Sequence, residues 1–178
     1  MITDSKKIEP LAAARKLPRN SGIILRDYDL DYKTRLKLGI ALKKICASKK
    51  IPLLIARDTK LALKLNADGI HFPQYLHSEI HKWRSKKPNW IITASAHFPI
   101  FMNTAIIAGA NAMLISPIFA TSSYPEKKPI GIIRAQSYIY DVNNHIIAYA
   151  LGGAKPSHLK ALKAAGFKGF AGISWVEN

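Results

Sequence analysis

Residues 53–74, LLIARDTKLALKLNADGIHFPQ, decide the fold class because they hold two apolar strands separated by a short helix. Ile51 to Ile55 is predicted as the first strand, Thr59 to Leu65 as the helix, and Asp68 to Phe72 as the second strand. Strands that are apolar without a break, and that are separated by helices, are typical of a parallel sheet covered on both faces. The stretch therefore predicts a β-α-β unit of an α/β protein.

The same alternation continues outward from this stretch in both directions. Further strands are predicted at Met1–Thr3, Gly22–Leu25, Trp90–Ala94, Ala112–Ile115, His145–Leu151 and Gly169–Ile173. Further helices are predicted at Tyr32–Lys49, Leu76–Arg84, Phe101–Ala108, Ile130–Tyr140 and His158–Ala165. Together these elements predict one domain, residues 1–178, with the fold of a compact (β/α)8 TIM barrel that lacks its last helix. An open doubly wound sheet is the alternative, although no G-x-G-x-x-G motif follows the early strands.

The composition excludes several classes of protein. With 48% hydrophobic residues, the 178-residue chain has enough apolar material for a sizeable core and is not a disordered chain. Its single cysteine, Cys46, excludes a disulfide scaffold and is expected in the core. No apolar stretch reaches the roughly 18–20 residues that a membrane span needs, and the N-terminus lacks the apolar segment of a signal peptide. We therefore expect a cytoplasmic protein.

The charge is strongly basic, with 27 Lys and Arg against 11 Asp and Glu and a net charge of +16. The lysine pairs are scattered along the chain, and there is no long basic run. Scattered lysines favour a solvated surface, and no nucleic-acid-binding motif is present. The sequence therefore predicts that nucleic acid is not the partner of this protein.

The predicted strand ends carry few carboxylates and many Arg, Ser, Thr and Gly residues, and function gathers at such ends in a barrel. Arg26 and Arg57 can pair with phosphate oxygens, and Gly152-Gly153 allows the backbone to approach a phosphate. This chemistry suits an anion better than a metal. Two alternatives stay open. The glycine pair is also typical of a tight turn, and the arginines could form ion pairs with nearby aspartates, namely Asp27, Asp58 or Asp68.

Four histidines are candidates for chemistry or for metal binding. His71 and His97 lie at predicted strand ends, where either a general acid/base or a structural role is open. His77 and His81 share one face of a predicted helix, and a solvated face is favoured there over a metal site that lacks a third ligand.

Three stretches of the chain resemble the thiamine-phosphate synthase/TenI superfamily. Residues 53–74 are similar to a strand, then Asn-Asp-Arg and L-A-L-x-x-G-A-D-G-V-H-L-G-Q. Residues 95–131 are similar to S-x-H, A-G-A-D and G-P-V-F-x-T-x-T-K-x-x-x-x-P-x-G. Residues 149–174 are similar to A-I-G-G-I followed by G-A-D-G-V-A-V-V-S, and GIILRD (22–27) matches V-Q-L-R-E-K.

The resemblance implies a (β/α)8 barrel that joins a pyrimidine diphosphate to a thiazole phosphate in thiamine biosynthesis, releasing pyrophosphate with the help of Mg²⁺. TenI-like relatives instead aromatise the thiazole phosphate. By matching position, the resemblance assigns Arg26 and Ser95 to catalysis and Arg26 and Arg57 to the pyrophosphate. It assigns five further residues to the substrate phosphate, namely Thr121, Ser123, Gly153, Ile173 and Ser174.

The chain departs from the family pattern on the pyrophosphate and metal side. The Asn-Asp-Arg of the family becomes Ala56-Arg57-Asp58, and the second metal-binding Asp becomes Leu76. Tyr28 replaces a Lys, and Pro117 stands where the TenI-type His would be. Because Mg²⁺ needs oxygen ligands, we expect no bound metal and no cofactor here. We expect a divergent synthase, a transferase if it is active; the alternative is a non-catalytic or TenI-like barrel that binds a phosphorylated ligand.

The predicted helix from Ile100 to Ala108 carries no charged side chain. An outer helix of a barrel needs a polar face toward solvent, and an uncharged one indicates an interface. Closed dimers are the commonest assembly, so the sequence predicts a homodimer that buries Phe101 and Met102 or their neighbours.

Overall fold

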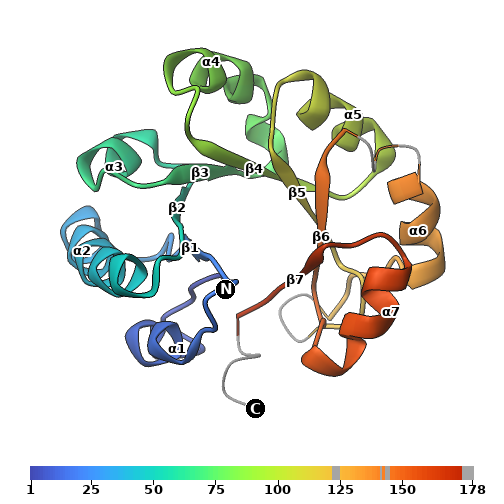
Figure 1. Cartoon of the computed structure of the whole chain (residues 1–178), viewed down its shortest axis with the longest axis horizontal. Helices are drawn as coiled ribbons and strands as arrows, with labels where there is room; N and C mark the ends of the chain where they lie inside the picture. Colours follow the sequence, from blue (N-terminus) through green and yellow to red (C-terminus); the bar gives the residue numbers. More distant parts are fainter. Residues whose placement is uncertain (122–124, 141, 143–144, 174–178) are drawn as a thin grey trace. The chain divides into compact units, whose positions relative to one another are not determined.

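The structure is a computed structural model of the whole chain, and it describes residues 1–121, 125–140, 142 and 145–173. The chain forms two compact units (Figure 1). Unit 1 comprises residues 1–71 together with Ile173, and unit 2 comprises residues 72–172. The single domain expected from the sequence stays a prediction.

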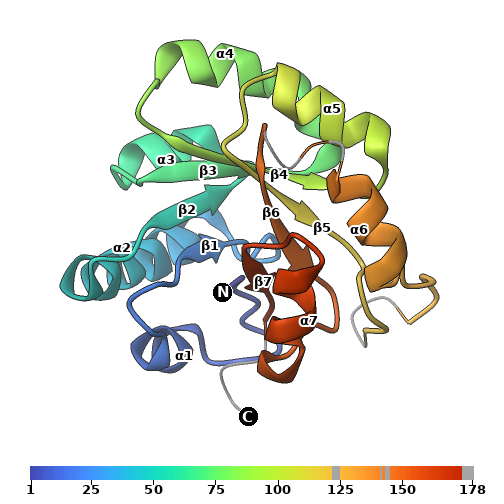
Figure 2. The same cartoon turned by 45° about the vertical axis from the view of Figure 1, so that its right-hand side comes forward.

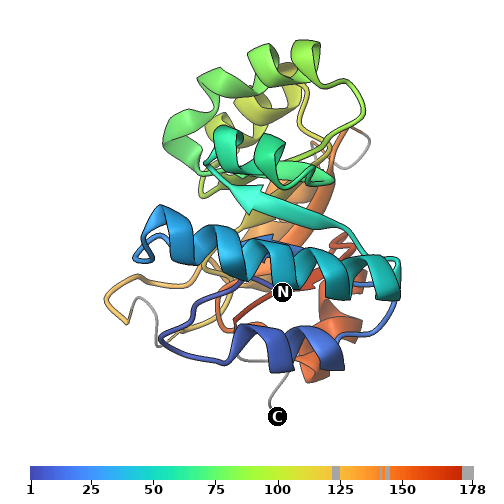
Figure 3. The same ribbon diagram turned by 90° about the vertical axis from the view of Figure 1, so that its left-hand side faces the viewer.

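Unit 1 alternates helices and strands. Its elements are α1 (Pro10–Lys16), β1 (Ile23–Leu25), α2 (Tyr32–Lys49), β2 (Leu53–Ala56), α3 (Thr59–Lys64) and β3 (Gly69–Phe72). The three strands pair in parallel, with Ile24 opposite Leu54 and Ile55 opposite Ile70. Figure 3 shows α1 and α2 lying side by side. The β-α-β unit predicted from residues 53–74 is therefore present.

The N-terminal segment extends this sheet by a single bridge. Ile2 pairs in parallel with Ile24, and the backbone N–H of Thr3 donates to the Ile24 carbonyl at 3.0 Å. The strand predicted at Met1–Thr3 is thus an isolated bridge, because its pairing ends where Thr3 Oγ1 accepts from the backbone N–H of Arg26. Helix α1 is not among the predicted elements. It begins at Pro10, a residue favoured in the first turn, and the carboxylate of Glu9 caps it.

Helix α2 has the bounds that the sequence predicts. Asp31 caps its first turn by accepting from the Thr34 N–H, and Lys50 ends it in the left-handed conformation. The helix packs closely because Gly39 has no side chain; an added Cβ would overlap a methyl group of Leu65. Its buried face also carries Leu42 and Cys46, so the expectation that Cys46 lies in the core is confirmed.

Unit 2 continues the alternation. Its elements are η1 (Gln74–Leu76), α4 (Ser78–Lys86), β4 (Ile91–Ala96), α5 (Pro99–Ile107), β5 (Ala112–Ile115), α6 (Ile132–Tyr140), β6 (Ile147–Leu151), η2 (Pro156–His158), α7 (Leu159–Ala164) and β7 (Gly169–Ala171). The strands from β4 to β7 pair in parallel with their neighbours in sequence order. Figure 2 shows α4 and α5 side by side on the outer side of β4 and β5.

One arginine organises the turn between α4 and β4. The Arg84 guanidinium donates to the carbonyls of Gly109, Pro88 and Trp90. Trp90 in turn stacks on Trp83, with 5.5 Å between ring centroids. These contacts fix the chain at the start of β4.

Within the described residues, no helix is both long and apolar enough to cross a membrane.

One sequence expectation in unit 2 is wrong. His77 does not lie on a solvated helix face; it is 3% exposed because its ring turns inward and contacts the Ser95 carbonyl and the edge of Phe101. Met102 is fully buried against the core of its own unit, so it is not available to a second copy. The exposed apolar side chains of this region are instead Ile100 and Ile107.

Candidate functional site

A cluster of three guanidinium groups surrounds the ring of Tyr28 in unit 1. Arg26 follows β1 and Arg57 follows β2, while Arg35 projects from the second turn of α2. Their Cζ atoms lie 5.9, 4.2 and 5.6 Å from the Tyr28 ring centroid, in the order Arg26, Arg57, Arg35. Aromatic faces attract cations, so one ring holds the three positive groups together. We call these four residues the arginine–tyrosine cluster.

Arg35 ties the ends of β1 and β2 together. Its Nη2 donates to the carbonyls of Leu25 at 3.2 Å and Ala56 at 2.9 Å, and its Nη1 lies 3.4 Å from Asp58 Oδ2. The residue is only 6% exposed, and this burial lowers the pKa of its guanidinium. Its Nε is buried without a hydrogen-bond partner. Arg35 is therefore a structural tie that positions the cluster.

Arg57 is the member of the cluster that can receive a ligand. Its backbone adopts a φ of 55°, a conformation that non-glycine residues rarely adopt, and is held there by the N–H that donates to the His71 carbonyl at 2.8 Å. The residue is exposed, and no carboxylate of the described part of the chain pairs with it. Its planar fork of donors thus remains open to a phosphate oxygen.

Arg26 is already engaged. Its Nη2 lies 2.7 Å from Oδ2 of Asp4, a residue that the sequence had not suggested as its partner. Neighbouring Asp27 turns the other way and accepts from the backbone N–H of Ser5 at 2.6 Å. The expected pairing of the arginines with Asp27, Asp58 or Asp68 is therefore wrong for Arg26, because the N-terminal segment brings Asp4 to it first.

The residues at the end of β2 do not fit a Mg²⁺ ion. The carboxylate of Asp58 already accepts from the backbone N–H of Leu61 at 2.9 Å and faces Arg35. Ala56 and Arg57 stand where the family would offer oxygen ligands, and a guanidinium repels a cation. Within residues 1–121, 125–140, 142 and 145–173, no three His, Cys, Asp or Glu side chains gather in a way that could hold a metal.

A second candidate site lies in unit 2, where the loop after β5 is held against the end of β6. The backbone N–H of Ile118 donates to the Leu151 carbonyl at 2.9 Å, and that of Phe119 donates to the Gly152 carbonyl at 3.0 Å. Gly153 has a φ of 63°, and an added Cβ would overlap the carbonyl oxygen of Ala120. We call residues 116–121 together with Gly152 and Gly153 the glycine-backed loop.

The glycine-backed loop needs glycine at positions 152 and 153 because the backbone of residues 117–120 lies very close to them. At Gly152, with a φ of 86°, a Cβ would lie 2.9 Å from both Cα and Cβ of Pro117. The glycine pair is therefore more than a tight turn, because side chains at these positions would push the loop away. Glycine at such positions is also the residue type that lets a backbone approach a phosphate.

His97 closes the other side of the glycine-backed loop. Its Nδ1 lies 2.6 Å from the Ser116 carbonyl oxygen, and its backbone N–H donates to the side-chain oxygen of Gln74 at 3.1 Å. Because a carbonyl can only accept, Nδ1 carries the proton in this contact. Nearby, the Nε2 of His77 lies 2.9 Å from the carbonyl oxygen of Ser95. Both histidines thus hold strand ends in place.

The structure brings together some of the predicted site residues. Gly153 and Thr121 belong to the glycine-backed loop, and Arg26 and Arg57 belong to the arginine–tyrosine cluster. Ser95 is half-buried near the end of β4. Ile173 is half-buried. Ser123 and Ser174 lie outside the residues that the structure describes. These assignments stay predictions, since their basis is the family pattern.

Sequence reasoning missed Arg35, although a signal for it exists. Positions 35, 39, 42 and 46 recur with the spacing of one helix face, and the other three are Gly, Leu and Cys. An arginine on the buried face of a helix requires internal partners, and here these are the carbonyls at two strand ends. In the sequence, Tyr28 is only a departure from the family pattern, yet its ring lies at the centre of the cluster.

Comparison with known proteins agrees with this geometry. A family model described as thiamine monophosphate synthase matches residues 1–176. The candidate thiamine-phosphate synthase 2 of Aquifex aeolicus is 36% identical over 84% of this chain and 79% of its own length. The thiamine-phosphate synthase of Prochlorococcus marinus is 31% identical over 80% of this chain, but only 40% of its own length is covered.

The solved structures establish the fold. A thiamine phosphate pyrophosphorylase from Pyrococcus furiosus superposes with a TM-score of 0.82, covering 97% of this chain and 83% of that one at 21% identity. A second, from Bacteroides thetaiotaomicron, has a TM-score of 0.65 over 98% of this chain and 81% of that one at 14% identity. The fold is thus the α/β TIM-barrel fold expected from the sequence. On the match of residues 1–176, the chain belongs to the thiamine-phosphate synthase family.

Proposed function

We propose that this protein forms thiamine phosphate by joining a pyrimidine diphosphate to a thiazole phosphate. The observation that carries the proposal is the glycine-backed loop, because a family motif and a close backbone approach coincide there. Two different chemical demands follow from the reaction. One is to bind the phosphate of the thiazole, and the other is to stabilise the pyrophosphate that leaves.

The glycine-backed loop suits the thiazole phosphate. Backbone N–H groups of the loop other than those of Ile118 and Phe119, together with the hydroxyl of Thr121, would bind the anion. Gly153 would let the loop approach close enough to form this site. Ser123, Ile173 and Ser174 complete this proposed set by their match to the family pattern. His97 would keep the loop in position through the Ser116 carbonyl.

The arginine–tyrosine cluster suits the leaving group. In the reaction, the bond between the pyrimidine methylene carbon and a pyrophosphate oxygen breaks, and both electrons leave with the oxygen. The thiazole nitrogen supplies the electron pair for the new carbon–nitrogen bond. Arg57 would bind the negative charge that develops on pyrophosphate, and Arg26 adds positive charge nearby. Ser95 is retained as the third proposed group from the family pattern.

A second candidate function rests on the missing carboxylates at the end of β2. A barrel that lacks them could bind a phosphorylated heterocycle without turning it over, or could carry out a TenI-like step on it. Such a protein keeps the glycine-backed loop and needs no pyrophosphate site. The two candidates therefore differ in what they require of Arg57.

The test is an assay of thiamine phosphate formation from the two phosphorylated substrates, run in excess EDTA and again with Mg²⁺. We expect product in both conditions. Arg57→Ala should lower the rate by about 100-fold, because removing one group that stabilises developing negative charge typically costs this much in kcat. Lys60→Ala is the matched control, an exposed cation in the same unit that should keep the wild-type rate. If no product forms while thiazole phosphate still raises the melting temperature, the binding function replaces the synthase function.

We also propose that a second copy of the chain covers α5. Ile100 and Ile107 on this helix are 66% and 84% exposed, and no residue between Lys87 and Glu126 is Asp, Glu, Lys or Arg. A chain with a net charge of +16 repels its own copies, so an uncharged face is where two copies can meet at the lowest electrostatic cost. Met102 itself is buried in the core, so its exposed neighbours on α5 would form the interface.

Sedimentation of the wild type, Ile107→Glu and Ile40→Glu tests the dimer. Ile40 on α2 is 46% exposed and serves as the control. A dimer that only Ile107→Glu dissociates supports the proposal, whereas a monomeric wild type at micromolar concentration contradicts it.

A cytoplasmic location is proposed from the single cysteine of the chain, Cys46. Burial raises the pKa of its thiol to about 11, so the thiol is unreactive.

A further inference from the structure

The carboxylates of unit 1 are engaged by local contacts. Three of them cap helices, since Glu9, Asp31 and Asp58 accept from backbone N–H groups at the starts of α1, α2 and α3. Asp27 is buried and accepts from a backbone N–H. The remaining carboxylates pair with neighbouring cations, in the pairs Asp4–Arg26, Asp29–Lys6 and Asp68–Lys43. None of these contacts involves the exposed cations on the outer surfaces of α1 and α2.

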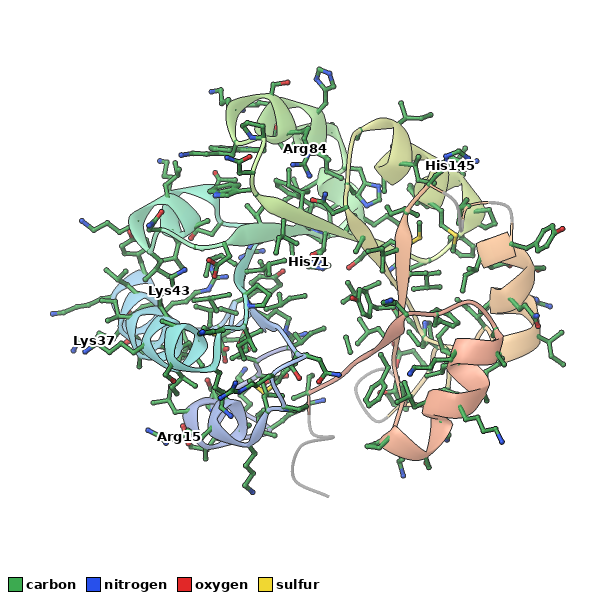
Figure 4. All side chains as sticks on the ribbon, in the orientation of Figure 1. Arg15, Lys37, Lys43, His71, Arg84 and His145 are labelled. Atoms are coloured by element: carbon green, nitrogen blue, oxygen red, sulfur yellow. The ribbon has the colours of Figure 1, made fainter. Side chains whose placement is uncertain are left out.

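Those cations gather on the outer surfaces of α1 and α2. Lys33, Lys37 and Lys44 are exposed on α2, and Arg15 and Lys16 are exposed at the end of α1. Figure 4 shows Lys37 and Arg15 pointing outward from these two helices. None of the five has a carboxylate partner within the described residues. We call these five residues the basic face.

The lysines on α2 form a regular row. Positions 33, 37 and 44 fall on one face of the helix and span eleven residues, or about 16 Å at ~1.5 Å per residue. No acidic residue occurs in α2 from Tyr32 to Lys49, so the row is not interrupted by opposite charge. Because α1 packs beside α2, the row is widened rather than isolated (Figure 3). The lysines that are scattered in the sequence are therefore collected by the fold.

We propose that the basic face docks the phosphate backbone of a double-stranded nucleic acid. Successive phosphates of one strand advance by ~3.4 Å along the duplex axis, so a ~16 Å row is long enough for each of its three lysines to meet a phosphate. The contact would be independent of base sequence, because lysines on a convex helix surface reach phosphates and not the base edges. This partner goes beyond the proposed reaction and reverses the expectation drawn from the scattered charge alone.

A membrane surface fits this face less well. Helices that lie on a bilayer insert an apolar face between the headgroups. The apolar face of α2 is already covered by its own unit, where Gly39, Leu42 and Cys46 are buried. The outward surface carries the row of cations with a single exposed aliphatic side chain, Ile40, between Lys37 and Lys44, and it suits a rigid array of phosphates. Phosphates of a duplex also release counterions on binding, which drives the association.

Fluorescence anisotropy with a labelled 20-base-pair RNA duplex, and with a DNA duplex of the same sequence, tests the proposal. The first variant is the triple Lys33→Glu, Lys37→Glu, Lys44→Glu. The matched control is the triple Lys155→Glu, Lys160→Glu, Lys163→Glu, which reverses three exposed lysines of unit 2 and changes the net charge equally. Circular dichroism establishes that both variants fold.

The wild type is expected to bind a duplex with a Kd of about 10⁻⁶–10⁻⁴ M near physiological salt. The α2 variant should lose at least tenfold in affinity, and its dependence of log K on log salt should flatten by about 2.7, or ~0.9 per lost phosphate contact. The control should lose less than threefold. Equal losses in both variants, or no binding at 0.05 M salt, would overturn the proposal. So would binding to phosphatidylserine vesicles without binding to either duplex.

Discussion

The glycine-backed loop and the arginine–tyrosine cluster show two ways in which a site can relate to its family pattern. In the loop, backbone meets backbone, and residues that match the pattern are those without room for a side chain. In the cluster, the pattern is partly replaced: Arg57 stands where the family pattern has an Asp, whereas Arg26 matches an Arg of the pattern. Backbone geometry thus constrains the sequence more tightly than charge does, because a charge can be supplied by another residue type.

The largest effect is expected at Gly153. Gly153→Ala places a methyl group on the Ala120 carbonyl and imposes a left-handed conformation, so it should destabilise the protein by about 3 kcal/mol. Gly131→Ala is the control, since Gly131 also has a positive φ, 78°, but has no atom within 4 Å of an added Cβ. It should cost only about 1 kcal/mol. Urea denaturation measures both, and equal losses would mean that backbone approach does not constrain the loop.

The cluster is expected to depend on Arg35 for stability. Arg35→Met removes the donors to the Leu25 and Ala56 carbonyls and should destabilise the protein by about 2 kcal/mol. Lys37→Met, two positions along the same helix and exposed, should change stability by less than about 0.5 kcal/mol. Thermal unfolding of the two variants compares them. An Arg35→Met protein as stable as the wild type would show that the strand ends need no tie.

A smaller effect is expected from His77, behind the loop. Burial lowers the pKa of His77 below its usual value of about 6.5; the contact with the Ser95 carbonyl acts in the opposite direction, and the neighbouring His97 adds a further lowering. The unfolded chain therefore binds a proton that the folded chain refuses, so stability should fall as pH drops below about 6.5. His77→Gln, whose amide can still donate to the Ser95 carbonyl, should lose less stability than the wild type between pH 7.5 and 5.5.

The control for His77 is His81→Gln, because His81 is exposed on the same helix. This variant should follow the wild-type pH dependence of the urea midpoint. If His77→Gln also follows the wild type, the buried ring does not contribute to acid sensitivity. The comparison then sharpens the role of His97, which contacts the Ser116 carbonyl after β5.

The sequence predicts those features of the fold and the site that depend on neighbouring residues in the chain, and it misses those that depend on distant segments. The bounds of α2 and β5 were predicted as they are found, since a cap at Asp31, a helical period and a four-residue apolar run define them locally. For the glycine-backed loop, the sequence indicates a turn or a close backbone approach at Gly152-Gly153, because glycine tolerates both, but it does not show that residues 116–121 pack there. The arginine–tyrosine cluster was predicted only in part, since the partners of Arg26 and Arg35 come from distant segments. His77 was misplaced because spacing alone does not say which helix face is covered.

The central claim is that guanidinium groups replace the metal of the family at the end of β2. Calorimetric titration of the protein with inorganic pyrophosphate in excess EDTA tests this claim directly. We expect the wild type and Lys60→Ala to bind with equal affinity, and Arg57→Ala to bind at least tenfold more weakly, about 1.4 kcal/mol. Pyrophosphate binding that requires Mg²⁺, or that persists unchanged in Arg57→Ala, would contradict the account.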